Sequence, residues 1–149
     1  MVIYYCIFSN REVNVEKLNV NYLEGRSFEA SVRNHKFRID LPLIARGKDT
    51  GPTPPELFIA SLASCIGMYL VFYCEKTRLD PTGIRIETNY EKTADRIEKI
   101  SAEFSLPSAK SEKEREEALG WAEKCLVHNT IHHKPEIKIT FLEVKDESP

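Results

Sequence analysis

Hydrophobic and polar residues alternate in short runs along much of the chain, and this period of two predicts β-strands. Three runs come early, separated by turn residues such as Gly25 and Asn34, and they cover residues 18–23, 28–32 and 36–41. Their close spacing predicts a meander or hairpins. Three later runs predict strands at residues 84–92, 97–106 and 136–143, and the last alternates most cleanly. The apolar start of residues 1–10 predicts a further strand or an arm that docks on a partner.

A long helix is expected to begin near residue 54. Thr53 is a good N-cap, the two prolines that follow occupy positions where no amide donor is needed, and Glu56 stands at the capping-box position. The helix should run to about Thr77, because residues 80–83 then form a turn.

A second helix is expected to begin after residue 111. Ser111 and Glu114 form another capping box. The amphipathic helix that they open should end within residues 128–135 and present four residues on one face, Ala118, Trp121, Ala122 and Cys125. Strands around two helices predict an α+β fold with a mostly antiparallel sheet.

The composition indicates one compact domain over residues 1–149. A net charge of −2 gives no electrostatic reason to expect nucleic acid as a partner. The four cysteines, at positions 6, 65, 74 and 125, lack the close spacing of a secreted disulfide scaffold. The first residues show no basic start or cleavage site of a signal peptide. We therefore expect a cytoplasmic protein.

The segment over residues 57–74 contains no charged residue. Its 18 residues just reach the length that suggests a transmembrane helix. Small and polar residues dilute its hydrophobicity, however, and no basic cluster flanks it, so we expect no membrane. A helix that is apolar on every face needs cover on every face, which a small domain rarely supplies alone. This predicts a homodimer.

Two of the cysteines are candidates for chemistry. Cys65 and Cys74 are nine residues apart on the first helix, so they point to opposite faces and cannot bridge. Cys65 lies beyond the reach of the helix dipole, and a cation from another segment must activate it if it is reactive. Cys125 is expected near the C-terminal end of its helix, where the partial negative charge disfavours a thiolate. We therefore expect Cys65, walled in by apolar residues, to attack, and Cys125, at a rim, to resolve.

Residues 51–65, GPTPPELFIASLASC, and residues 125–131, CLVHNTI, resemble the two cysteine motifs of the OsmC/Ohr family of thiol-dependent peroxidases. The likeness spans residues 25–144. It implies an intertwined homodimer with cysteine-bearing helices packed between antiparallel sheets and active sites at the subunit interface. It also implies hydroperoxide detoxification in the oxidative stress response, without a cofactor: Cys65 attacks an organic hydroperoxide, Cys65 and Cys125 form a disulfide, and a dithiol reductant restores them.

The family also uses a glutamate and an arginine, which this chain matches less closely. Pro55 occupies the position of the family's active-site glutamate, and Glu56, one residue later, would point about 100° away. Glu56 is therefore either a catalytic residue or only a helix cap. Arg26 is the best match to the family's arginine, and Arg46 is the second choice.

Two other classes of function compete with the peroxidase. Cys125, His128 and His132 have a C-x2-H-x3-H spacing that would suit a metal-binding module, although a polar helix end is the simpler interpretation and we expect no metal. A non-enzymatic dimer that senses redox state or binds an apolar ligand is the other alternative. We assign Cys6 and Cys74 to packing.

Overall fold

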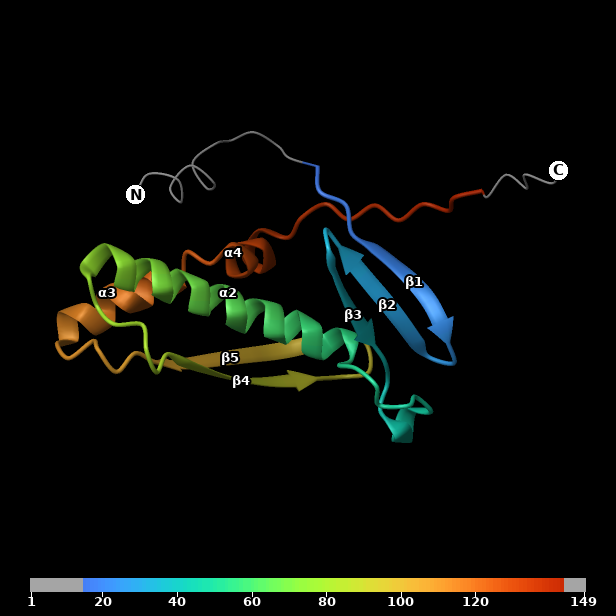
Figure 1. Ribbon diagram of the computed structural model, residues 1–149, viewed down its shortest axis with the longest axis horizontal. Helices are drawn as coiled ribbons and strands as arrows, with labels where there is room; N and C mark the ends of the chain where they lie inside the picture. Colours follow the sequence, from blue (N-terminus) through green and yellow to red (C-terminus); the bar gives the residue numbers. More distant parts are fainter. Residues whose placement is uncertain (1–14, 144–149) are drawn as a thin grey trace. The chain divides into compact units, whose positions relative to one another are not determined.

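The computed structural model of the chain describes residues 15–143 (Figure 1). It divides into two compact units, Met1–Leu57 and Phe58–Pro149, and we describe each by itself. The expected strand or arm at residues 1–10, and Cys6 with it, lie outside the described residues. The assignment of residues 1–149 to a single domain stays a prediction.

The first unit contains an antiparallel meander, as its sequence pattern predicts. Its three strands follow each other in the order β1 (Asn19–Glu24), β2 (Ser27–Val32) and β3 (His35–Ile39). Gly25 takes a positive φ of 55° in the tight turn between β1 and β2, a conformation that glycine adopts without strain. This turn fixes the place of Arg26.

A buried carboxylate organises the loop that follows the meander. Asp40 accepts hydrogen bonds from the backbone amides of Leu41, Lys48 and Thr50 and from the Thr50 hydroxyl, at 2.8–3.2 Å. Burial alone would raise the pKa of Asp40, but these hydrogen bonds outweigh it and hold the pKa below its ordinary value. The loop contains the short helix η1 (Leu43–Ala45) and thus has a defined course.

The second unit is built around α2 (Pro54–Thr77), whose first turn completes the first unit. The hairpin of β4 (Arg85–Lys92) and β5 (Ile97–Ser105) packs against it, and α3 (Glu112–Ala122) and α4 (Leu126–His133) follow. The core brings together α2 residues such as Leu62, Ile66 and Leu70 with side chains from the hairpin and α3. The hairpin approaches α2 closely at Gly67, where an added Cβ would lie 3.1 Å from Cδ1 of Ile86.

Both predicted capping boxes are present. The Thr53 amide donates to Glu56 Oε2 at 2.7 Å, and the Glu56 amide donates to Thr53 Oγ1 at 3.4 Å. The Ser111 amide donates to Glu114 Oε2 at 2.8 Å, and the Glu114 amide returns a bond to Ser111 Oγ at 3.2 Å. Each box satisfies amides at a helix start that have no intrahelical partner.

The second predicted helix is in fact two helices. Its last turn tightens after Ala122, where the amides of Lys124 and Cys125 donate to carbonyls only three residues back. Cys125 then leaves the helical conformation, with φ −51° and ψ 129°, and is the N-cap of α4. The expectation that Cys125 lies near the C-terminal end of a helix is therefore wrong.

Residues 136–143 do not form the predicted strand. Their apolar side chains are largely exposed, as at Ile139 (92%) and Phe141 (91%). A strand needs a neighbour for its backbone hydrogen bonds, and the two sheets within residues 15–143 contain only β1 to β5. The alternation of apolar and polar residues was therefore not sufficient to predict a strand at residues 136–143.

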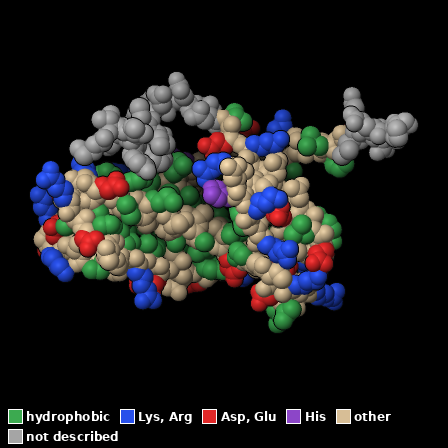
Figure 2. All heavy atoms as spheres, viewed as in Figure 1, with side chains coloured by type: hydrophobic (Ala, Val, Ile, Leu, Met, Phe, Trp, Pro, Cys, Tyr) green, Lys and Arg blue, Asp and Glu red, His purple; other side chains and the backbone are tan. Residues whose placement is uncertain are grey.

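The helix α2 is only partly covered within the described chain. Six of its residues are buried, while Phe58 and Met68 are exposed. Hydrophobic side chains gather along the region of α2 in the space-filling view (Figure 2). By length and composition α2 could also cross a membrane, and about a third of its most apolar window, 33%, is buried.

Candidate active site at the paired thiols

The structure brings Cys65 and Cys125 together. Cys65 lies near the middle of α2 and is partly buried, while Cys125 lies between α3 and α4 and is fully buried. Both pack on the same core cluster, both are free thiols, and their side chains are within hydrogen-bonding range of each other. The two helical segments thus converge on one pair of sulfurs.

The environment of Cys125 keeps its thiol protonated. Burial raises the pKa of Cys125 to about 11, and the hydrogen bond to Cys65 adds to this effect. The amide of His128, which donates to Cys125 Sγ at 3.5 Å, only partly opposes it. At neutral pH Cys125 is therefore a protonated thiol beside Cys65.

The environments of the two thiols differ from those that the sequence suggested. Cys125 is the buried thiol and Cys65 the more accessible one, whereas we expected Cys65 to be walled in and Cys125 to lie at a rim. The physical reason is the break after α3, which turns Cys125 inward as an N-cap. Burial, and not the helix dipole, disfavours its thiolate.

Tyr69 is a neighbour of the thiols that the motifs did not indicate. It follows Cys65 by one helical turn on α2. Burial raises the pKa of Tyr69, and the negative charge that either cysteine would carry raises it further. The i, i+4 spacing between Cys65 and Tyr69 could have indicated from the sequence that the two side chains lie on the same face of α2. Tyr69 remains a neutral phenol beside the sulfur pair.

Cys74 takes no part in this pair. It lies on another face of α2, as the nine-residue spacing predicts, and it is buried in the core. Burial raises its pKa, and the charge of Asp80 adds to the effect. This environment agrees with a packing role.

The other predicted site residues belong to the first unit. Arg26 is exposed in the turn between β1 and β2, and Arg46 is exposed after η1 with a φ of 60°. Within residues 15–143 neither guanidinium makes a hydrogen bond or an ion pair. Glu56 acts in the capping box of α2. Catalytic roles for these three residues stay predictions.

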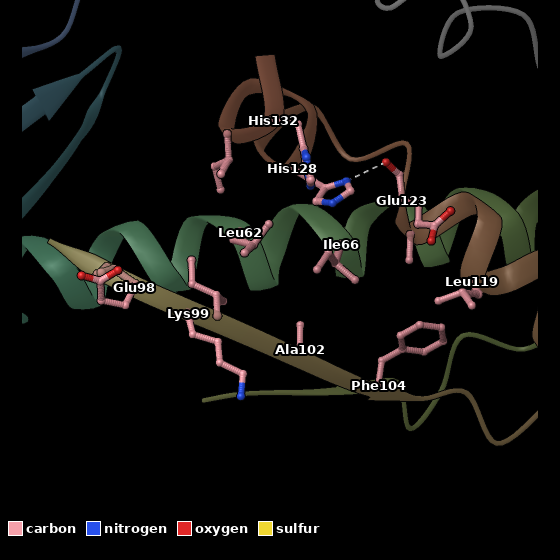
Figure 3. Close-up of a pocket in the computed structure, with 14 residues that line it drawn as sticks. Leu62, Ile66, Glu98, Lys99, Ala102, Phe104, Leu119, Glu123, His128 and His132 are labelled. Carbon is pink, nitrogen blue, oxygen red and sulfur yellow. Dashed lines mark hydrogen bonds between the residues drawn. The ribbon is translucent and has the colours of Figure 1, made fainter. Parts of the chain in front are cut away.

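A pocket of about 430 Å³ lies in the second unit, and Leu62 and Ile66 of α2 are among the residues that line it (Figure 3). Its walls come from α2, β5, α3 and α4, and its polar lining includes His128 and His132. In the part of the chain that the structure describes, no three histidine, cysteine or acidic side chains are grouped closely enough to hold a metal ion. The geometry gives no support to a metal centre at Cys125, His128 and His132.

Comparison with known proteins decides the family. The OsmC-like protein family matches residues 47–140, which include both thiols. The chain belongs to this family. No curated protein sequence matches it.

Solved structures show the same fold as this OsmC-like chain. A protein ascribed to the osmotic stress and detoxification response of Psychrobacter arcticus 273-4 superposes with a TM-score of 0.72 at 21% identity, covering 83% of this chain and 93% of that one. An OsmC-like protein from Mycoplasma pneumoniae gives 0.70 at 16% identity, with 81% and 89% covered. An organic hydroperoxide resistance protein OsmC from Legionella pneumophila gives 0.56 at 17% identity, with 81% and 91% covered. The predicted α+β OsmC-like fold is confirmed.

Proposed function

We propose that this protein is a thiol peroxidase that reduces organic hydroperoxides with Cys65 and Cys125. The observation that carries the proposal is the pairing of a partly buried thiol, Cys65, with a fully buried one, Cys125, whose pKa is about 11. Membership of the OsmC-like family and a similar fold in a hydroperoxide resistance protein support it. The chemistry needs no cofactor.

The reaction would proceed in two steps on the protein. The thiolate of Cys65 attacks the distal oxygen of the hydroperoxide; the O–O bond breaks, the alkoxide takes up a proton and leaves as the alcohol, and Cys65 becomes a sulfenic acid. The sulfur of Cys125 then attacks the Cys65 sulfur, the S–S bond forms, and the hydroxyl leaves with a proton as water. An external dithiol would reduce the disulfide by thiol–disulfide exchange.

The hydrogen bond between the thiols suits the first step. Because Cys125 stays protonated at neutral pH, its S–H can donate to the thiolate of Cys65 and stabilise it. A cation would stabilise that thiolate further, and Arg26 or Arg46 is proposed to supply it. Glu56 is proposed to act mainly as the cap of α2.

A homodimer is part of the proposal. The exposed Phe58 and Met68 of α2 and the exposed apolar residues of 136–143 offer surface that a second copy would cover. Burying several hundred Å² of such surface would contribute many kcal/mol, at about 25 cal/mol per Å². A cytoplasmic location fits the free thiols and is likewise proposed.

Turnover and mapping of the oxidised peptides test the proposal. Treatment with a stoichiometric organic hydroperoxide should link Cys65 to Cys125 and leave Cys6 and Cys74 reduced. With a dithiol present, the native chain should consume hydroperoxide catalytically, and Cys65→Ser should not. A link between Cys65 and Cys74 would contradict the helix geometry, and no thiol loss at all would contradict the peroxidase.

The pocket favours one second candidate, a dimer that binds an apolar ligand without turnover. Its volume of about 430 Å³ lies in the range of small-molecule sites. Stoichiometric oxidation without catalytic consumption of hydroperoxide would favour this candidate or a redox sensor over the enzyme.

A further inference from the structure

Trp121, in the last turn of α3, contacts side chains from α2 and from the junction that carries Cys125. Its ring centroid lies 6.4 Å from that of Tyr73 and 5.3 Å from the Lys76 ammonium, and both of these residues are on α2. The ammonium of Lys124, the residue directly before Cys125, lies 4.9 Å from the same centroid. We call Tyr73, Lys76, Trp121 and Lys124 the Trp121 clamp.

The two helices that meet in the Trp121 clamp are firmly packed. Figure 1 shows α3 beside the end of α2. Tyr73 is buried, and its hydroxyl donates to Glu117 Oε2 on α3 at 3.2 Å. Ala118 and Ala122 of α3 are buried in the core cluster to which α2 contributes. The ring of Trp121 is therefore held on a well-packed pair of helices.

The ring of Trp121 is the partner of both ammonium groups. Lys76 and Lys124 are exposed, and within residues 15–143 neither ammonium forms a hydrogen bond or an ion pair. A cation over an aromatic face is attracted by the negative charge of the π system. Lys124 is thus attached to Trp121 twice, through this contact and through its amide, which donates to the Trp121 carbonyl at 3.1 Å.

The chain after Cys125 is held less firmly than the chain before it. The helix α4 has no buried residue, and its Val127 and Ile131 are only partly buried against the core cluster. The amide of Cys125, in contrast, donates to the Ala122 carbonyl at the packed end of α3, at 3.2 Å. The position of the Cys125 sulfur therefore depends on how Lys124 is held.

We propose that Trp121 is a positioning residue for disulfide formation: by holding Lys124, it keeps the Cys125 sulfur directed at Cys65. Trp121 acts through the backbone of the junction and not on the reacting atoms. In this step the S–S bond forms, and the hydroxyl of the sulfenic acid leaves with a proton as water. The inference rests on the proposed function, to which this step belongs. A misplacement of about 1 Å can slow a reaction about a hundredfold, so loss of the Trp121 clamp should be visible in the rate.

Single-turnover oxidation by an organic hydroperoxide, followed by mass spectrometry, separates the two steps. Trp121→Leu and Lys124→Met should each slow the disulfide phase about tenfold and leave oxidation of Cys65 within about twofold of the native rate. Trp121→Phe and Lys124→Arg keep a ring and a cation and should restore most of the disulfide rate. Lys92→Met, the matched control, removes an exposed ammonium that does not lie over the ring and should change neither phase.

The two phases also separate positioning from a general loss of stability. An unchanged disulfide phase, equal slowing of both phases, or no rescue by Trp121→Phe and Lys124→Arg would each overturn the inference. If Trp121→Leu does not fold, Lys124→Met gives the same comparison at an exposed position.

An aromatic disulfide, dithiobis(nitrobenzoate), tests positioning without peroxide. The Cys65 thiolate attacks one of its sulfurs, a nitrothiobenzoate leaves, and a mixed disulfide forms. The Cys125 sulfur, after giving its proton to solvent, then displaces the second nitrothiobenzoate. The second release, followed by absorbance, should be about tenfold slower in Lys124→Met than in the native chain, and a native rate there would overturn the inference. A native chain that releases both thiolates but consumes no hydroperoxide would refute only the peroxidase.

Discussion

Formation of the disulfide should accelerate about tenfold with each pH unit between pH 6 and pH 9. Its nucleophile is the thiolate of Cys125, and a pKa of about 11 leaves only about one thiol in ten thousand ionised at pH 7. Relative to an ordinary value of 9.0, this shift lowers the thiolate fraction about a hundredfold. Burial is the largest cause of the shift, and it persists when Cys65 is oxidised to the sulfenic acid.

A single-turnover experiment measures this step directly. Reduced protein is mixed with one equivalent of organic hydroperoxide at each pH, and acid-quenched samples are analysed by mass spectrometry for sulfenic acid and disulfide. The only tryptophan of the chain, Trp121, lies four residues before Cys125, so its fluorescence should follow the same step. The disulfide phase should be independent of hydroperoxide concentration, because it is intramolecular.

Cys125→Ser is the control, and it should remove the second phase while Cys65 still oxidises to a persistent sulfenic acid. The oxidation phase of the native chain serves as an internal reference at each pH. A disulfide rate that stays flat from pH 6 to pH 9 would refute the assignment of a buried, protonated resolving thiol.

Three further changes test other parts of the account. Arg26→Ala, or Arg46→Ala if that residue is the activating one, should slow oxidation of Cys65 by tenfold or more, about 1.4 kcal/mol of barrier; pH-dependent alkylation that is unchanged in both variants would contradict this. Asp40→Asn should lower the urea midpoint of unfolding near neutral pH, and it should make that midpoint fall less as the pH is lowered. The pKa of Asp40 is lower in the folded state, so its carboxylate stabilises the fold above the unfolded-state pKa. This stabilisation is lost as the pH falls through the folded-state pKa. Ala63→Lys places a charge in the uncharged run of residues 57–74 and should prevent folding. For the native chain, ultracentrifugation at sub-micromolar concentration should show a dimer, and a well-folded monomer would contradict that prediction.

Local signals in the sequence predicted most of the fold. The capping boxes at Thr53 and Ser111 fixed two helix starts, because a cap depends only on residues within one turn. The meander and the hairpin followed from alternation with short turns, since each strand pairs with its neighbour in sequence. Residues 136–143 show the limit of this reasoning: the pattern is as clean, but a strand also requires a partner.

The sequence indicated that Cys65 and Cys125 lie together, but it did not indicate which of the two thiols is buried. Helix periodicity correctly separated Cys65 from Cys74. It could not show the break between α3 and α4, because residues 123–125 contain no glycine or proline to mark a helix end. Which thiol is buried depends on that break, and so the exposures were assigned the wrong way round.

In the proposed mechanism, the same break would allow the buried thiol of Cys125 to react. Two sulfurs within hydrogen-bonding range must approach to about 2.05 Å to form a disulfide, and a side chain inside a regular helix is tied to the whole helix. Cys125 is an N-cap, outside the regular backbone of both helices, and it is tied to them by end bonds, such as its amide to the Ala122 carbonyl at 3.2 Å and its carbonyl to the Asn129 amide at 3.0 Å. In the proposed mechanism we therefore expect the short α4 to shift with Cys125 while α2 holds Cys65 in place. Burial disfavours the Cys125 thiolate before and after the sulfenic acid forms, and the position of Cys125 at the helix junction would let it reach that acid.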